Sequence, residues 1–204
     1  MRLFQKSERV SVKINQKGKI ILMSNQAYTF YSGGLKGAEE TFGKYAQKHD
    51  INEVNFSFDG HTPSRDKNIT LLSDAELKKG NISMEIVSAR MGRRYARADK
   101  IRKVFQIIFH MVNKGYQVFA IGWIQSDQTV KGGTGWGVEL AKFFNRPVSV
   151  FDQTENKWFT WKGSEWVEDE PVISNKTFCG TGTRNLSDEG KKAIENLFSR
   201  SFAS

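Results

Sequence analysis

Three times in this chain a short β-prone run stops at a glycine-rich turn, and a helical pattern follows. The runs cover residues 27–31, 116–123 and 177–179, and the turns after them read SGGLKG (32–37), KGGTGWG (131–137) and GTGTR (180–184). Repeated strand–turn–helix units favour a parallel sheet covered by helices. Turns that follow parallel strands share one edge of the sheet, so we expect the three to converge on one ligand. The predicted fold class is α/β with a mainly parallel sheet.

The remaining segments fit around these units. Residues 9–14 alternate in polarity, and residues 19–23 continue in apolar side chains after a polar turn, which predicts an N-terminal β-hairpin. The other expected elements are a strand at 54–58, helices at 73–77, 83–90 and 94–112, and a strand pair at 147–151 and 157–161. No linker rich in Pro, Ser or Gly divides the chain. We therefore expect a hairpin appendage over residues 1–26 and a single domain over residues 27–204.

Composition limits the classes of function. The N-terminal sequence MRLFQKSERV has no apolar core of signal-peptide length. No window approaches about 18 uninterrupted apolar residues, so export and membrane spanning are both disfavoured and a cytoplasmic location is expected. One cysteine and three histidines offer no zinc constellation. No metal and no cofactor are expected.

The formal net charge of +9 indicates either attraction to a polyanion or a positive pocket in a generally basic surface. The densest basic run is ARMGRRYARADKIRK at residues 89–103, and its cations are spread around the predicted helix. Either a solvated helix or a ligand-facing one fits this pattern. The polar loop DGHTPSRDKN at 59–68, which contains His61 and Arg65, follows a predicted strand and suits a mobile cover.

Glycine turns at helix N-termini are suited to binding anions. Glycine lacks the Cβ that would keep a phosphate from the backbone, and a helix N-terminus offers free N–H groups with a favourable dipole. None of the three turns reads GxGxxG with a downstream acidic residue, or GxxxxGK[ST], so a dinucleotide Rossmann site and a P-loop are both unsupported. A phosphate-bearing nucleotide held on backbone amides is the ligand that the turns predict.

Two of the turns carry a family resemblance. Residues 132–139 (GGTGWGVE) resemble the GGxGTxxE motif of the lonely-guy family of cytokinin-activating phosphoribohydrolases, with Glu139 at the same spacing. Residues 32–39 (SGGLKGAE) are similar to the SGGAxGAD turn of the wider SLOG superfamily, which joins those enzymes to the DNA-processing protein A family. The resemblance implies a Rossmann-like domain whose turns hold the phosphate and ribose of a nucleotide. It also implies a dimer, because the related hydrolases complete their sites across a subunit interface.

The resemblance further implies catalytic residues. In the hydrolases an arginine of an RK pair binds the substrate, and the motif glutamate assists cleavage of the N-glycosidic bond; Arg102, Lys103 and Glu139 occupy the corresponding positions. Two departures put the enzymatic function in doubt: Trp136 replaces a threonine, and the chain from Arg102 to the motif strand is longer than expected. Trp136 either stacks on a base or ribose or packs beneath the turn. Glu139 is either catalytic or a first-turn glutamate favoured by the helix dipole.

The third turn, GTGTR, resembles the GxGSR or GIGTR turn that normally begins such domains, yet here it comes last. We infer a circular permutation in which the customary first strand and helix close the chain, so that their end lies near the strand at 27–31. This arrangement also resembles a phage-associated group with GGTGW and GIGTR motifs. The guanidinium of Arg184 either donates two parallel hydrogen bonds to a phosphate or pairs with a surface carboxylate.

Three functions remain open at this point. The first is hydrolysis of a nucleotide N-glycosidic bond, for which the catalytic candidates are Glu139 and Arg102. The second is binding without turnover of a signalling nucleotide, of the cyclic dinucleotide or ADP-ribose type. The third, less favoured, is nucleic-acid binding of the DNA-processing type. The expected ligand-binding residues are Ser32, Gly33, Gly34, Lys36, Gly37, Lys103, Gly132, Gly133, Thr134, Gly135, Trp136, Gly180, Thr181, Gly182, Thr183 and Arg184.

Overall fold

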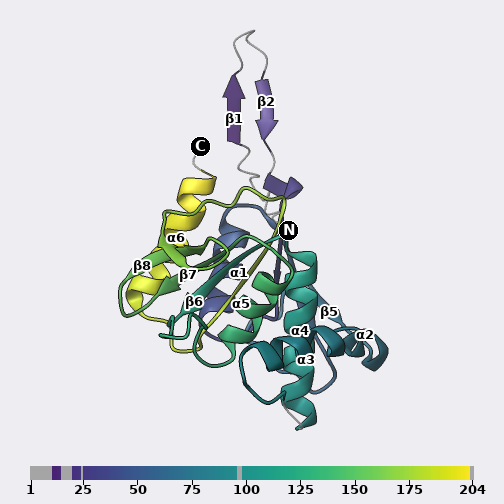
Figure 1. Cartoon of the computed structure of the whole chain (residues 1–204). Helices are drawn as coiled ribbons and strands as arrows, with labels where there is room; N and C mark the ends of the chain where they lie inside the picture. The colour runs from purple at the N-terminus through teal and green to yellow at the C-terminus, as the bar shows by residue number, and fades with distance from the viewer. Residues whose placement is uncertain (1–10, 15–19, 24, 96–97, 203–204) are drawn as a thin grey trace.

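An eight-stranded sheet forms the centre of the computed structural model, which describes residues 11–14, 20–23, 25–95 and 98–202 (Figure 1). Its strand order is β5-β4-β3-β10-β6-β7-β8-β9, and neighbouring strands are parallel from β5 through β7. The last two strands, β8 and β9, run antiparallel at one edge. The sheet strands are β3 (Thr29–Ser32), β4 (Asn52–Ser57), β5 (Ile69–Leu71), β6 (Gln117–Gly122), β7 (Val148–Asp152), β8 (Lys157–Trp161), β9 (Trp166–Glu168) and β10 (Thr177–Gly182).

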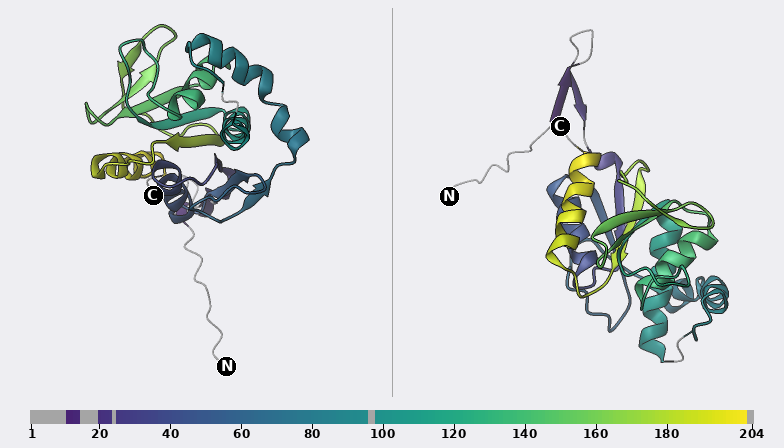
Figure 2. Two further views of the ribbon diagram at one scale, coloured as in Figure 1. Left: turned by 90° about the horizontal axis from the view of Figure 1, so that it is seen from below. Right: turned by 60° about the vertical axis from the view of Figure 1, so that its left-hand side comes forward.

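Helices cover both faces of this sheet (Figure 2). Helices α1 and α6 lie on one face, and α4 and α5 lie on the other with α2 and α3 beside them. The helices are η1 (Asn25–Ala27), α1 (Ala38–Lys48), α2 (Asp74–Lys78), α3 (Asn81–Arg90), α4 (Asp99–Lys114), α5 (Thr134–Phe143) and α6 (Asp188–Ser201). The predicted α/β class is thus confirmed, and the arrangement is Rossmann-like.

The two faces of the sheet have separate hydrophobic cores. Strand β6 is buried at all six positions because helices cover both of its faces, which is why its sequence shows no polar alternation. On the α1/α6 face an aromatic cluster fills the core, with Phe30, Phe42, Phe119, Phe178 and Phe198 fully buried. The other face is lined mainly by aliphatic and sulfur-containing side chains from α4, α5 and β7.

Strand β10 lies between β3 and β6 and is parallel to both, although it is the last strand in the chain. The C-terminal strand is therefore central in the sheet, and α6 packs beside α1 on one face. The end of α6 returns to the start of β3, where the rings of Tyr28 and Phe202 lie 5.0 Å apart. This short distance is the geometry that a permuted order requires.

The local predictions are largely confirmed. The N-terminal hairpin forms from β1 (Ser11–Ile14) and β2 (Ile20–Met23), which are antiparallel, while the other hairpin residues before 24 lie outside the described residues. The predicted strand pair is the antiparallel β7–β8. The long helix predicted over 94–112 begins five residues later, at Asp99; Arg94 and Tyr95 are not helical, and Ala96 and Arg97 lie outside the described residues.

Candidate functional site

All three glycine turns lie at the carboxyl edge of the sheet, after the neighbouring strands β3, β10 and β6. The helices after β3 and β10 cover one face, and the helix after β6 covers the other. The point where the covering helix changes faces, here between β10 and β6, is where open α/β sheets form their ligand crevice. The sheet order therefore brings the three sequence motifs to one place.

The SGGLKG turn uses several of its polar groups within the protein. The amide of Gly34 donates to the Ser32 hydroxyl at 3.0 Å, and the amide of Leu35 donates to the Glu39 carboxylate at 3.0 Å. The Gly34 carbonyl accepts from the amides of Ser64 and Arg65. This turn is covered by the 59–68 loop and offers little free backbone to a ligand.

The 59–68 loop is anchored by a buried ion pair. The guanidinium of Arg65, 8% exposed, donates to both carboxylate oxygens of Glu53 on β4 and to the side-chain oxygen of Gln47 on α1. The fixed backbone of this loop explains why residue 34 is a glycine: its φ is +67°, and a Cβ there would lie 2.8 Å from the Arg65 carbonyl oxygen. Arg65 is therefore a structural residue, which the loop's composition alone did not indicate.

Glu39 lies at the centre of this edge and was not among the expected site residues. Its carboxylate is 4% exposed and accepts a 2.9 Å hydrogen bond from the Thr181 hydroxyl. Burial raises the pKa of Glu39, while hydrogen bonds from Leu35, Thr181 and neighbouring groups partly offset the rise. The sequence does contain a signal for this residue, because Glu39 aligns with the acidic last residue of the SGGAxGAD motif.

The GTGTR turn packs directly against the SGGLKG turn. The first amide of α1, at Ala38, donates to the Thr183 carbonyl at 3.1 Å, so this helix N-terminus is capped by protein. Gly37 has φ +96°, and a Cβ there would lie 2.5 Å from the Thr183 carbonyl oxygen. Gly180 is in the strand itself, where a Cβ would lie 2.6 Å from the ring of Phe42. These glycines are explained by close packing.

Positive charge gathers beside these two turns. Burial lowers the pKa of His61, and the nearby cations Lys100 and Arg184 lower it further. These three residues come from the loop after β4, the N-terminus of α4 and the loop after β10. Arg184 is exposed at this edge. The pKa of His61 is thus lowered by burial first and by these two cations second.

The KGGTGW turn, in contrast, is open. Gly132 has φ +69°, and a Cβ added at Gly132 or Gly133 would meet nothing within 4 Å. Both glycines are exposed, and α5 begins directly after them at Thr134. Among the described residues, the amides of Gly132, Gly133 and Thr134 make no backbone–backbone hydrogen bond. The N-terminus of α5 therefore presents the free donors that an anion requires.

Arg93 holds this turn in place from the linker between α3 and α4. One terminal nitrogen donates to the carbonyls of Val130 (3.0 Å) and Gly132 (3.3 Å), and the other donates to the side chains of Gln125 (2.8 Å) and Thr129 (2.9 Å). A Cβ at Gly135 would overlap the Val130 carbonyl oxygen and lie 2.6 Å from the Arg93 guanidinium, so this glycine makes room for the backbone at Val130 and for Arg93.

A cavity of about 600 Å³ opens at this turn. Its lining combines cations, the glycines of the turn and apolar side chains: Arg93, Arg94, Ile101, Phe105, Gln125, Asp127, Lys131, Gly132, Gly133 and Trp136. The rings of Phe105 and Trp136 are stacked at 4.3 Å, and Tyr95 packs against both. Trp136 is 4% exposed, so it packs beneath the turn and also contributes to the cavity wall.

Sequence reasoning did not single out Arg93, Arg94 and Lys131. The first two belong to the basic run at 89–103, whose pattern fits either a solvated or a ligand-facing helix, and Lys131 precedes the glycines of the motif. The linker brings Arg93 and Arg94 to the mouth of the cavity. Burial raises the pKa of the adjacent Tyr95 to about 12, so its phenol stays neutral beside these cations.

The proposed catalytic residues lie outside the cavity lining. Glu139 is buried and forms ion pairs with Arg90 at 3.1 Å and Lys142 at 3.6 Å. Burial lowers the pKa of Lys142, whose ammonium lies 3.7 Å from the ring centre of Trp161. Glu139 is therefore part of a charged cluster below the turn.

The RK pair is also engaged elsewhere. The Arg102 guanidinium lies 5.3 Å from the ring centre of Tyr95, and the Lys103 ammonium pairs with Asp74 at 2.9 Å and with Asp99 at 3.6 Å. The hydrogen bond to Asp74 raises the pKa of Lys103. Arg102 thus contacts Tyr95, and Lys103 pairs with the first residue of α2.

Within the described part of the chain, no group of three or more His, Cys, Asp or Glu side chains is placed to hold a metal ion. No helix among the described residues is long and apolar enough to span a membrane. Comparisons of the chain with protein families, with curated proteins and with solved structures find no match.

Proposed function

We propose that this protein binds a phosphate-bearing nucleotide in the cavity at the KGGTGW turn. The observation that carries the proposal is an open glycine turn at a helix N-terminus facing two exposed cations, Arg94 and Lys131. The amides of Gly133 and Thr134 would hold the phosphate, because the helix dipole and free N–H groups favour an anion there. The aromatic wall would lie against the base or ribose.

The dimensions and charge of the cavity support this assignment. About 600 Å³ is within the range of sites for nucleotide-sized ligands. Three cations and one carboxylate line it, and that carboxylate, Asp127, is already hydrogen-bonded to the amide and hydroxyl of Thr129. The net positive lining favours phosphate over a neutral nucleoside.

Binding without hydrolysis is the function that this geometry favours. A carboxylate that assists N-glycosidic cleavage must approach the ribose, but Glu139 faces Arg90 and Lys142 and is absent from the cavity lining. Hydrolysis would require this buried cluster to open. The protein is thus proposed as a binder that retains its nucleotide intact, of the kind that senses or sequesters a signalling nucleotide.

Calorimetry with AMP, ADP-ribose and cyclic di-GMP, with adenosine as the phosphate-free control, tests this function. We expect binding of at least one phosphate-bearing compound, no binding of adenosine, and no free base by chromatography. Replacing both Arg94 and Lys131 with Gln should weaken binding by about 10- to 100-fold. Lys176→Gln, an exposed cation before β10 at the opposite edge of the sheet, is the matched control and should leave affinity unchanged.

Two results would contradict the proposal. If Lys176→Gln weakened nucleotide binding as much as the loss of Arg94 and Lys131, the weaker binding would reflect the overall charge of the protein and not a site at the KGGTGW turn. Tight binding of single-stranded DNA with a steep salt dependence, in the absence of nucleotide binding, would favour the nucleic-acid function instead.

A further inference from the structure

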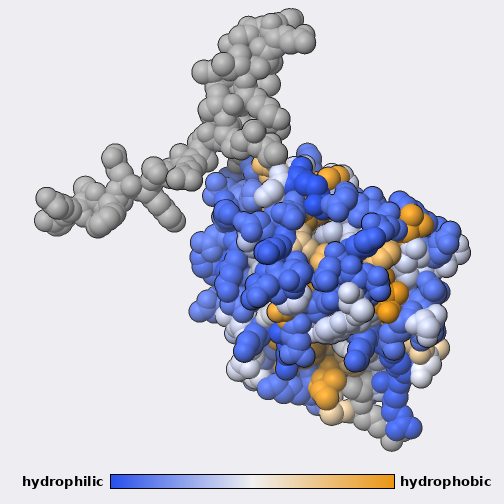
Figure 3. Space-filling model, turned by 90° about the vertical axis from the view of Figure 1, so that its left-hand side faces the viewer, coloured by the Kyte–Doolittle hydropathy of each residue, from blue (hydrophilic) through white to orange (hydrophobic). Residues whose placement is uncertain are grey.

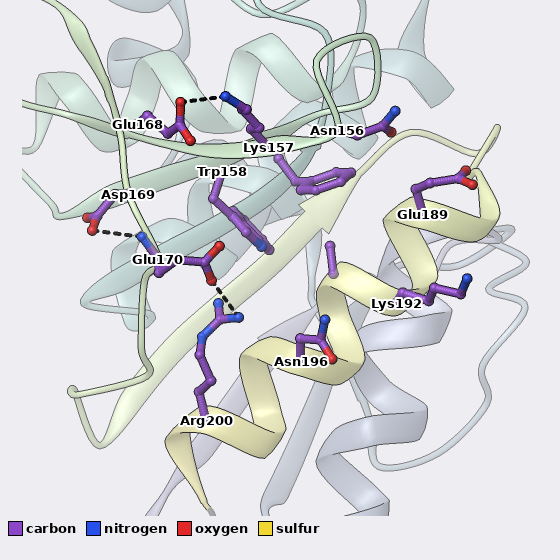
Figure 4. Close-up of a pocket in the computed structure, with 12 residues that line it drawn as sticks. Asn156, Lys157, Trp158, Glu168, Asp169, Glu170, Glu189, Lys192, Asn196 and Arg200 are labelled. Carbon is purple, nitrogen blue, oxygen red and sulfur yellow. Dashed lines mark hydrogen bonds and ion pairs between the residues drawn. The ribbon is translucent and has the colours of Figure 1, made fainter.

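A second cavity, of about 430 Å³, lies between α6 and the antiparallel edge of the sheet. It shares no lining residue with the cavity at the KGGTGW turn. Figure 3 views the molecule from the side that carries α6 and β8, where the surface is mainly hydrophilic with small apolar areas. Figure 4 shows the residues around the cavity, which come from β7, β8, β9, the segment after β9, and α6.

The floor of this cavity is apolar and contains an unpaired donor. Phe151, Trp158 and Ala193 are all buried, and in Figure 4 the indole of Trp158 projects from β8 toward α6. Trp158 is 3% exposed, and its buried Nε1–H group donates no hydrogen bond to any described residue. Buried indole N–H groups normally have a partner. This donor therefore indicates a missing acceptor.

An ion pair stands at one end of the cavity. The guanidinium of Arg200 on α6 reaches the Glu170 carboxylate at 2.7 Å and donates to the Pro171 carbonyl at 3.1 Å (Figure 4). The side chain of Glu170 is 73% exposed, so one partner of the pair remains open to solvent. The cavity thus presents a fixed positive group and a fixed negative group side by side, next to the indole donor.

This mixed lining discriminates between classes of ligand. Three cations (Lys157, Lys192 and Arg200) and four carboxylates (Glu168, Asp169, Glu170 and Glu189) line the cavity. A simple anion would gain from the cations and the Trp158 N–H group but would meet the carboxylates. A simple cation would gain from those carboxylates but would compete with Arg200 and leave the indole unpaired. A molecule with a carboxylate and an ammonium attached to the same carbon atom can satisfy the cations, the carboxylates and the indole N–H group of the cavity at once.

We propose that this cavity binds a free α-amino acid with an apolar side chain. The ligand carboxylate accepts from Trp158 Nε1–H and from the guanidinium of Arg200, the ammonium faces Glu170, and the side chain covers the floor formed by Phe151 and Ala193. Because Nε1 is buried, this binding mode requires the rim side chains to shift and admit the carboxylate to the indole. A volume of about 430 Å³ holds such a ligand together with water.

Nitrogen–proton NMR of the indole groups tests this proposal directly, because the chain has five tryptophans. Trp158→Phe identifies the Trp158 resonance by its disappearance. Titration of the wild type with L-leucine or L-phenylalanine, up to about 10 mM, should shift that resonance in a saturable manner. Trp158→Phe keeps the apolar ring but lacks the donor, so it should bind about tenfold more weakly in calorimetry.

Matched analogues separate the charge requirement from simple apolar binding. 4-Methylpentanoate lacks the ammonium of leucine, and 3-methylbutylamine lacks its carboxylate; neither should shift the Trp158 signal. An equal shift with either analogue would overturn the two-charge assignment. A Trp158 resonance unmoved by L-leucine and L-phenylalanine would overturn the site, and this wild-type measurement stands even if Trp158→Phe fails to fold.

Discussion

The carboxylate of Glu39 accepts a 2.9 Å hydrogen bond from the hydroxyl of Thr181, a residue 142 positions further along the chain. This contact joins the first glycine turn of the sequence to the last. Together with the bond from the Ala38 amide to the Thr183 carbonyl, it makes the two turns one packed unit. The third turn is left as the open one, so the ligand proposal rests on it.

Gly37→Ala should be strongly destabilising. The residue has φ +96°, and its Cβ would lie 2.5 Å from the Thr183 carbonyl oxygen, so strain and overlap add. We expect a loss of about 2–4 kcal/mol in the free energy of unfolding, measured by urea denaturation. Gly60→Ala is the control, because Gly60 also has positive φ (+82°) but open space around it. It should cost about 1 kcal/mol; equal losses would show that the packing of the two turns contributes nothing.

Glu39→Gln should change how stability depends on pH. Burial raises the pKa of Glu39 above its ordinary value of 4.5, so the folded state binds more protons than the unfolded state between the two values. The destabilisation from the buried charge is present above the folded pKa and disappears as pH falls through it. Relative to Glu39→Gln, the wild type should therefore gain stability as the pH is lowered through the raised pKa of Glu39 toward its ordinary value of 4.5.

Thr181→Val provides a second test of how the buried Glu39 carboxylate makes stability depend on pH. The Thr181 hydroxyl donates to the ionised carboxylate and lowers its pKa, so its removal should raise the pKa of Glu39 further. Urea denaturation at several pH values should then show a steeper gain toward acid pH than in the wild type. A difference between wild type and Glu39→Gln that stays constant with pH would contradict the buried-charge account.

Arg93→Lys should loosen the KGGTGW turn while preserving charge. Lysine cannot reach the four oxygens that Arg93 bonds on residues 125, 129, 130 and 132. We expect about 1–2 kcal/mol lower stability and faster amide hydrogen exchange over residues 125–132. Arg94→Lys is the matched control, since Arg94 is exposed and its charge is kept. Unchanged exchange in Arg93→Lys would show that the clamp is not needed to order the turn.

Glu139→Gln distinguishes a structural role from catalysis. Loss of the charge leaves Arg90 and Lys142 without their carboxylate, and we expect about 1–3 kcal/mol lower stability with nucleotide affinity retained. Glu168→Gln removes a carboxylate from an exposed pair with Lys157 and should cost about 0–1 kcal/mol. Detection of free base with the wild type, and its loss in Glu139→Gln with binding intact, would establish hydrolysis.

Much of the fold was predictable because its signals are local. Apolar runs that end in glycine, followed by helical spacing, identified the units of β3–α1, β6–α5 and β10–α6, and an antiparallel pair was evident in β7–β8. The late GTGTR turn indicated that the end of the chain would lie near the strand at 27–31, whereas the central place of β10 between β3 and β6 comes from the structure. The dimer, the domain division and the nucleotide ligand stay predictions.

The sequence by itself determined that three glycine turns would meet at one edge, since parallel strands place their carboxyl ends together. Tertiary structure alone decided which turn is open. Gly37 and Gly132 look alike in sequence, yet one accommodates the Thr183 carbonyl and the other faces solvent. Likewise, Arg65 bonds to Glu53, Arg93 bonds to Val130 and Glu139 pairs with Arg90, partners that are 12, 37 and 49 residues away. Such pairings depend on packing across elements, which no local pattern encodes.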